Sequence, residues 1–149
     1  MPNLVHDPSP IDALAPTRLK SATTAGILIG AVVIASLLDT AIAAIGHAAG
    51  ASHQFQPLQA PPFISFTLLG ILIGAGGWAI VRRRATQPRV LLRRLVPTVL
   101  GLSFIPDLAM LVSSYLPHSN VAGVISLLAM HVVVAATAVI AYTRALPVG

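Results

Sequence analysis

The stretch TAIAAIGHAAGASHQFQPLQAPPFISFTLLGILIGAGGWAIV (residues 40–81) decides the fold, because it contains no Asp, Glu, Lys or Arg. It is far longer than the about 20 apolar residues that a helix needs to cross a hydrocarbon core of about 30 Å. A polar, proline-bearing patch at residues 47–62 divides it. We therefore expect two membrane-spanning helices here, over residues 21–46 and 63–81, joined by a loop.

The rest of the chain points to the same class of protein. Two further apolar segments, residues 95–116 and 121–143, are long enough to span a membrane. Of all 149 residues, 56% are hydrophobic and 9% are charged, and the mean hydropathy is +0.87. A soluble domain carries about 25% charged residues. We predict an all-α, four-helix transmembrane bundle over residues 21–149, preceded by a flexible, proline-bearing N-terminal tail at residues 1–20.

The basic residues predict the orientation, because Lys and Arg in short loops mark the cytoplasmic side. All nine lie before the first span, between the second and third spans, or after the fourth. We therefore expect both termini in the cytoplasm, in a multi-pass protein of the bacterial cytoplasmic (inner) membrane. The same distribution accounts for the positive net charge, so no nucleic-acid partner is predicted. The arginines between the second and third spans are expected to contact anionic lipid head groups: Arg82, Arg83, Arg84, Arg89, Arg93 and Arg94.

Glycines mark candidate packing surfaces, because small residues let helices approach closely in lipid. Gly26 and Gly30 lie about one turn apart in the first span, and Gly70, Gly74 and Gly77 follow one stripe of the second. We expect these glycines to form a packing seam, either with another span or with a second copy. Four spans enclose little room, so we expect a homo-oligomer or docking into a larger membrane assembly.

Three ionisable residues fall inside the spans: Asp39, Asp107 and His131. Because a charge in hydrocarbon is costly, each is expected to face the bundle interior and to have a partner. Asp107 and His131 lie at the same depth at 1.5 Å per residue. The tight turn at residues 117–120 makes their helices neighbours, so we expect the two side chains to pair. Asp39 lies about one helical turn nearer the outer side.

Two interpretations of this polar centre remain open. In the structural one, Asp107 and His131 satisfy each other and fix the register of their helices. In the functional one, Asp39, Asp107 and His131, with Ser36 and Ser103 beside them, line a ligand or proton site that opens outward. The matching functions are a binding protein or accessory subunit and, as the alternative, a proton-linked carrier of a small or hydrophobic ligand.

The sequence gives little support for catalysis. Ser103, His131 and Asp107 can be named as a Ser–His–Asp set, but no nucleophile elbow surrounds the serine. The chain has neither Cys nor Glu, so a His-Glu-x-x-His zinc motif is absent from it. We predict no catalytic residue, no metal and no cofactor, and we favour a non-enzymatic role while leaving enzymatic activity undecided.

Two short segments carry a family resemblance, SFIPDL (residues 103–108) and LAMHVVVAA (residues 128–136). They resemble the third and fourth spans of a family of small four-span bacterial membrane proteins known only as a domain of unknown function. The resemblance covers most of the chain from about residue 21, and its Pro-Asp and Met-His elements are the most distinctive. It implies a four-span fold and adds weight to Asp107 and His131, but it implies no reaction or ligand.

Overall fold

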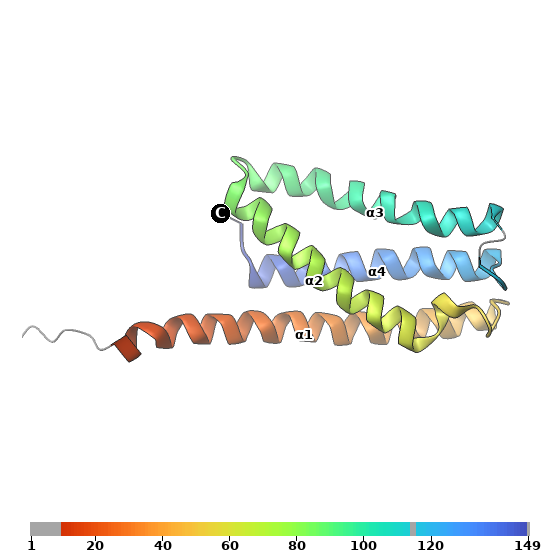
Figure 1. The fold of residues 1–149 in the computed structure, drawn as a ribbon, viewed down its shortest axis with the longest axis horizontal. Coiled ribbons are helices and arrows are strands. Elements are labelled where there is room, and N and C mark those ends of the chain that lie inside the picture. Colours follow the sequence, from red (N-terminus) through yellow and green to blue (C-terminus); the bar gives the residue numbers. More distant parts are fainter. Residues whose placement is uncertain (1–9, 114–115, 149) are drawn as a thin grey trace, which may run out of the picture.

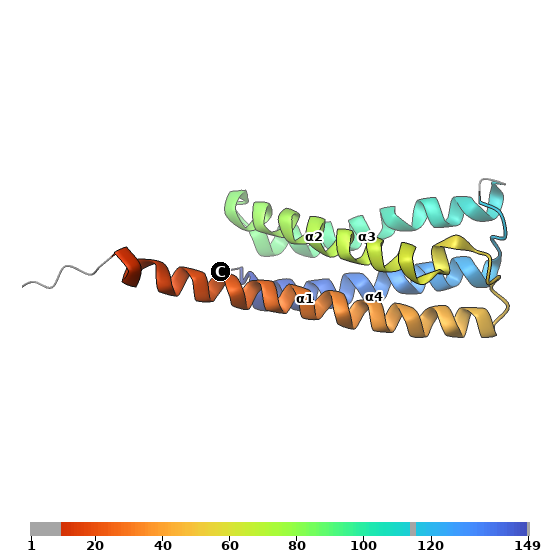
Figure 2. The same cartoon turned by 60° about the horizontal axis from the view of Figure 1, so that its bottom comes forward.

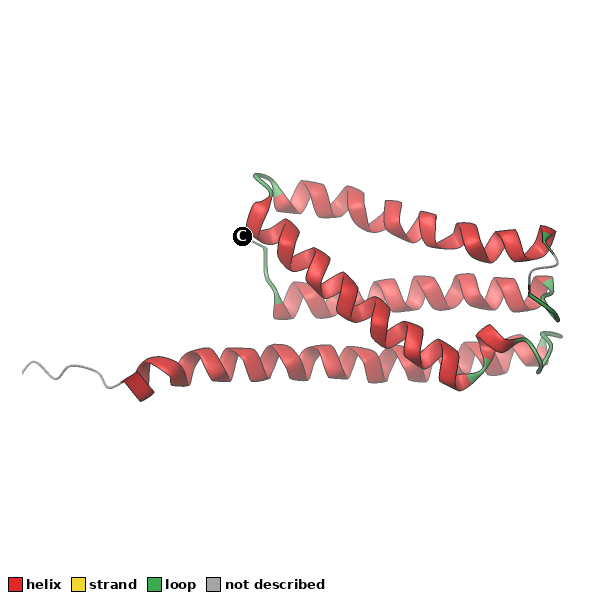
Figure 3. Ribbon diagram, in the orientation of Figure 1, coloured by secondary structure: helices red, strands yellow, loops and turns green. Residues whose placement is uncertain are grey.

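Four long helices make up the protein in the computed structural model, which describes residues 10–113 and 116–148 and, of residues 10–20, the backbone alone. Figure 1 shows how they follow one another along the chain. The described residues contain no β-strand, and loops join the helices (Figure 3). The elements are α1 (Pro10–Ala48), the short 3-10 helix η1 (Gln56–Leu58), α2 (Ala60–Arg84), α3 (Pro88–Val112) and α4 (Val121–Ala145).

All four helices are long and apolar enough to cross a membrane, α1 from Ser21 onward. Much of their apolar surface faces outward, as in Phe66, whose side chain is 73% exposed. In the most apolar part of α4, 33% of the residues are buried inside the protein, against 6% in α3. The fold is therefore an all-helical bundle whose central helix is α4 and whose outward surface suits lipid.

Successive helices run in opposite directions (Figures 1 and 2). The N-terminal part of α1, the α2–α3 turn and the end of α4 consequently lie at one end of the bundle, which we call the arginine end. The end of α1, η1 and the start of α4 lie at the other, which we call the loop end. The helix α4 packs against all three of the others and most extensively against α1.

A row of small residues on α1 forms the main packing surface. Ala31, Ala35 and Ala43 are buried, and their spacing of four and eight residues keeps them on one helix face. The first two belong to an apolar cluster with residues of α2 and α4, and Ala43 belongs to a second cluster nearer the loop end. Small side chains let α1 and α4 approach closely, which is how helices gain contact in lipid.

The row ends at Gly46, where the backbone of α1 lies directly against Ser126 of α4. A Cβ added at Gly46 would overlap the Oγ of Ser126 on α4. That hydroxyl donates a hydrogen bond of 2.9 Å to the carbonyl of Ala122, so it is already held in place. Gly46 is therefore required by the close approach of the two helices.

The glycines expected to form the packing seam behave differently. Only Gly74 faces another helix closely: it lies against the hydroxyl of Tyr142. A Cβ added at any of the other four would meet nothing within 4 Å: Gly26, Gly30, Gly70 and Gly77. These four glycines therefore make no close contact with another helix among the described residues, and their packing against a second copy stays a prediction.

The first helix begins earlier than the predicted span. Residues 10–20, expected to be part of a loose tail, continue α1 as a helix, and residues 1–9 lie outside the described residues. Proline is favourable at the first position of a helix, as at Pro10, and the Ala and Leu residues that follow it are strong helix formers.

The third helix is shifted toward the arginine end relative to the predicted span at residues 95–116. It begins at Pro88 because arginine, which lowers hydropathy, is nonetheless a good helix former. It ends at Val112 because Ser113 adopts an extended conformation, with φ −114° and ψ 140°. Hydropathy located the apolar part of this helix but not its ends.

We expect Gly46→Leu to lower the free energy of unfolding by about 1–3 kcal/mol, because the new side chain forces α1 away from α4. The measurement is unfolding in detergent micelles, followed by the fluorescence of the single tryptophan, Trp78. Gly101→Leu is the control, since a Cβ there meets nothing within 4 Å. Equal effects of the two substitutions would contradict the packing described.

Candidate functional site

A layer of polar side chains crosses the bundle, with one residue from each helix: Asp39, Thr67, Asp107 and His131. Along α1, α2 and α4, the layer residue lies between members of the two apolar clusters. The cluster toward the arginine end contains Trp78 and Tyr142, and the one toward the loop end contains Phe55, Leu58 and Phe63. The polar layer is thus enclosed by apolar packing on both sides.

Asp39 is the most deeply buried charged residue of the layer, with 1% of its surface exposed. It lies between Ala35 and Ala43 in the small-residue row of α1, so the packing that joins α1 to α4 also buries its carboxyl group. Oγ1 of Thr67 on α2 donates a hydrogen bond of 2.7 Å to Oδ2 of Asp39. This bond satisfies one carboxylate oxygen across a helix interface.

Thr67 is not among the residues that the sequence singled out. Its position in the sequence could have identified it, because every fourth residue along this part of α2 is buried and Thr67 is the polar member of the series. The series is Phe63, Thr67, Ile71 and Ala75. A polar residue on an otherwise apolar buried stripe needs a partner inside the bundle. In this bundle that partner is Asp39.

Asp107 and His131 meet across α3 and α4. The Nδ1 of His131 lies 3.1 Å from Oδ2 of Asp107, and the side chains are 38% and 7% exposed, respectively. The same Nδ1 lies 2.9 Å from the carbonyl oxygen of Leu127, one turn earlier on α4. Nδ1 carries at most one hydrogen, and the carbonyl of Leu127 is the nearer acceptor for it. The contact between Nδ1 and Asp107 is therefore an ion pair by distance and not a hydrogen bond.

The two pairs lie in the same polar layer, Asp39 with Thr67 across α1 and α2 and Asp107 with His131 across α3 and α4. The structure therefore brings together the three ionisable residues singled out in the sequence. Ser36 lies one turn before Asp39 on α1. Ser103 is occupied within its own helix, where its hydroxyl donates a 2.7 Å hydrogen bond to the carbonyl of Leu100.

Three buried polar atoms of this region have no hydrogen-bond partner among the described residues: Oγ of Ser36, Oδ1 of Asp39 and Oδ2 of Asp107. Such atoms are rare in native proteins and commonly mark a bound water or a functional group. The two carboxyl oxygens can accept a proton or a hydrogen bond, and the hydroxyl of Ser36 can donate or accept a hydrogen bond. The described residues contain no group of three or more His, Asp or similar side chains placed to share a metal ion.

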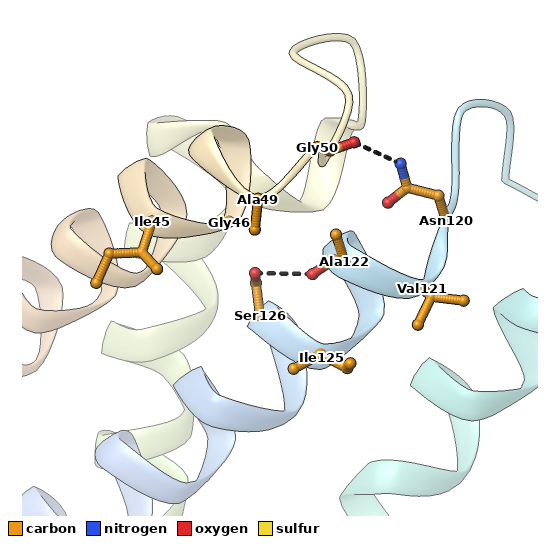
Figure 4. Close-up of a pocket in the computed structure, with 9 residues that line it drawn as sticks. All are labelled: Ile45, Gly46, Ala49, Gly50, Asn120, Val121, Ala122, Ile125 and Ser126. Atoms are coloured by element: carbon orange, nitrogen blue, oxygen red, sulfur yellow. Dashed lines mark hydrogen bonds between the residues drawn. The ribbon is translucent and has the colours of Figure 1, made fainter.

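An open groove lies at the loop end between α1 and α4 (Figure 4). Asn120 closes one side of it, where its side-chain amide donates a 2.8 Å hydrogen bond to the carbonyl of Gly50. The polar-layer residues Asp39, Asp107 and His131 do not line the groove, so it is separate from the polar layer. The lining is mainly apolar: Ile45, Gly46, Ala49, Gly50, Asn120, Val121, Ala122, Ile125 and Ser126.

The six arginines between α2 and α3 gather at the arginine end. Five are exposed and Arg82 is partly buried. Arg89 donates hydrogen bonds of 3.4 and 3.2 Å to the carbonyl of Val148, which holds the segment after α4 against the start of α3. This end therefore presents a strongly positive surface.

The four apolar helices and their enclosed polar layer define a small multi-pass membrane protein. The chain belongs to a family of unknown function (DUF6069), whose model matches residues 19–148. That match covers all four candidate spans and confirms the family resemblance drawn from α3 and α4. No curated protein and no solved structure matches the chain.

We expect Thr67→Val to lower the free energy of unfolding by about 1–3 kcal/mol, because the isosteric change leaves the buried carboxylate of Asp39 without its hydrogen-bond donor. Thr98→Val is the matched control, since Thr98 is exposed and bonds only the carbonyl of Arg94 in its own helix. Denaturant unfolding in micelles measures both. A Thr67→Val effect no larger than that of the control would contradict the partnership.

Proposed function

We propose that the protein is a membrane protein of binding or accessory-subunit type, which self-associates or docks into a larger assembly through the open glycine faces of α1 and α2. The observation that carries the proposal is the space beside Gly26, Gly30, Gly70 and Gly77, where an added Cβ meets nothing within 4 Å. Glycine in a helix interior costs about 0.5–1 kcal/mol relative to alanine. A neighbouring helix packed on these faces offsets that cost.

The surroundings of the glycines support the same proposal. Gly26 and Gly30 form a Gly-xxx-Gly pair on α1, a spacing that lets two helix backbones come close. On α2, Gly70 and Gly77 lie two turns apart, and the large side chains of Phe66 and Ile73 beside them are exposed. Bare backbone next to protruding apolar side chains is a surface into which a second helix fits.

The placement in the cell follows from charge. We place the protein in the bacterial inner membrane with the arginine end and both termini in the cytoplasm, because Lys and Arg near span ends are retained on that side. The exposed arginines then contact anionic head groups. In this function the pair Asp107 and His131 fixes the register of α3 against α4.

We expect Gly26→Leu/Gly30→Leu to weaken self-association at least tenfold, because bulky side chains keep a second helix away from α1. The chain has no cysteine, so Gln54→Cys at the loop end provides one site for donor and acceptor dyes. Energy transfer is then measured in liposomes at decreasing protein-to-lipid ratio.

Gly101→Leu is the control for that experiment, because it places the same bulk on an open face of α3. It should leave energy transfer unchanged. Wild-type protein whose energy transfer equals that of randomly distributed dyes would contradict self-association, and docking into another assembly would then remain to be tested by copurification from the membrane.

One observation favours a second function, that of a proton-linked carrier of a small or hydrophobic ligand. Oδ1 of Asp39 and Oδ2 of Asp107 lack hydrogen-bond partners among the described residues, although both lie in the buried layer. Intramembrane carboxylates with spare acceptors are found along proton relays. This function uses Asp39, Asp107 and His131 as successive proton sites.

For the carrier function, we expect wild-type protein in liposomes to dissipate an imposed pH gradient, and Asp39→Asn to abolish the effect because an amide cannot exchange the proton. An internal pH-sensitive dye reports the gradient. Ser103→Ala should retain wild-type flux, since that hydroxyl is bonded within α3. Flux equal to that of empty vesicles would contradict proton movement through the polar layer.

A further inference from the structure

A second open groove lies at the arginine end, where α2 turns into α3. It is formed by the end of α2, the short turn and the first two turns of α3. The side chains that matter to its chemistry are Arg84, Thr86, Gln87, Val90, Leu91 and Arg94. Two arginines from different helices thus share one depression with a hydroxyl, an amide and two apolar side chains.

The charges of this groove are unbalanced. Arg84 and Arg94 are both exposed, and neither side chain has a hydrogen-bond or ion-pair partner among the described residues. The acids whose side chains the structure describes, Asp39 and Asp107, lie in the buried layer. The first turn of α3 contains no acid, so the positive end of its helix dipole adds to the arginines instead of being neutralised. An anion would relieve repulsion between like charges here.

An apolar stripe leads away from the groove along α3. Leu91 lines the groove, and Leu95, Val99 and Leu102 follow it on the same face. All four are exposed large hydrophobic side chains. The stripe runs from the arginine end toward the middle of the bundle, in the direction that an acyl chain takes from a head group into the membrane.

We propose that this groove binds one anionic phospholipid, with its phosphate between Arg84 and Arg94 and an acyl chain along the stripe from Leu91 to Leu102. Guanidinium groups bind phosphate oxygens with paired hydrogen bonds, which suits arginine at such a site. Thr86 and Gln87 offer donors to the rest of the head group. The proposal rests on the head-group contact proposed for the arginine end and narrows it to one site, independently of self-association.

The test compares two double variants that remove the same charge from the same two helices. Arg84→Gln/Arg94→Gln removes the groove arginines, and Arg83→Gln/Arg93→Gln removes exposed arginines that do not line the groove. Native mass spectrometry of the full chain in neutral detergent counts phosphatidylglycerol and phosphatidylcholine bound per copy. We expect wild-type protein to retain one phosphatidylglycerol with at least tenfold preference. The groove variant should lose that preference, and the control variant should keep it.

Thermal unfolding adds a readout that nonspecific attraction would not give. Without lipid, the groove variant should unfold at the same temperature as wild type or higher, because it lacks the repulsion between Arg84 and Arg94. Phosphatidylglycerol should raise the unfolding temperature of the wild type and of the control variant, because a ligand that binds the folded state stabilises it. It should not raise that of the groove variant.

Each contrary result has a distinct meaning. Equal loss in both double variants would overturn the site and leave a diffuse head-group contact in place. Absence of any preference for phosphatidylglycerol in the wild type would overturn both the site and the head-group contact. Displacement of the lipid by inorganic phosphate at equal concentration would overturn the part assigned to the acyl chain. The same spectra report the number of protein copies, so the outcome for self-association is recorded separately.

Discussion

The structure depends on one constraint: a carboxyl group that enters the hydrocarbon core on a spanning helix must be enclosed and given partners. Asp39 satisfies this constraint. It lies in the middle of the small-residue row of α1, where close packing against α4 keeps lipid away from its carboxyl group and Thr67 of α2 donates a hydrogen bond to it. The contact of Asp107 with His131 adds α3 to the same layer. Each of the four helices thus contributes one side chain, and the apolar clusters on both sides complete the bundle.

Charge and hydropathy predicted the four helices and their order, because the exclusion of ionised side chains from lipid acts on every residue of a span. Equal depth and a short turn likewise predicted that Asp107 and His131 meet. The partner of Asp39 and the true packing row were missed because alanine and threonine are ordinary in any apolar helix. Their role follows only from which face α1 turns toward α4, and tertiary packing decides that. Helix ends were missed for a related reason: arginine ends a hydropathy window without ending a helix.

The interior and the outer surface of the bundle carry different chemistry. Inside, three buried oxygens of the polar region lack hydrogen-bond partners among the described residues, and one of them, the hydroxyl of Ser36, can donate as well as accept. Outside, uncovered glycines lie on α1 and α2, and exposed arginines gather at the arginine end. The interior therefore specifies how the four helices pack, and the outer surface is where partners and lipid are expected to bind.

The central claim is that the buried side chains of the layer hold the helices together through one another. A double-mutant cycle tests it most directly, with Asp107→Ala, His131→Ala and the combined variant unfolded in micelles. We expect a coupling free energy of at least about 1 kcal/mol, because removing His131 leaves the carboxyl group of Asp107 buried without its counterpart. Additive effects of the two substitutions would contradict it and would mean that the two side chains lie near each other without stabilising the bundle.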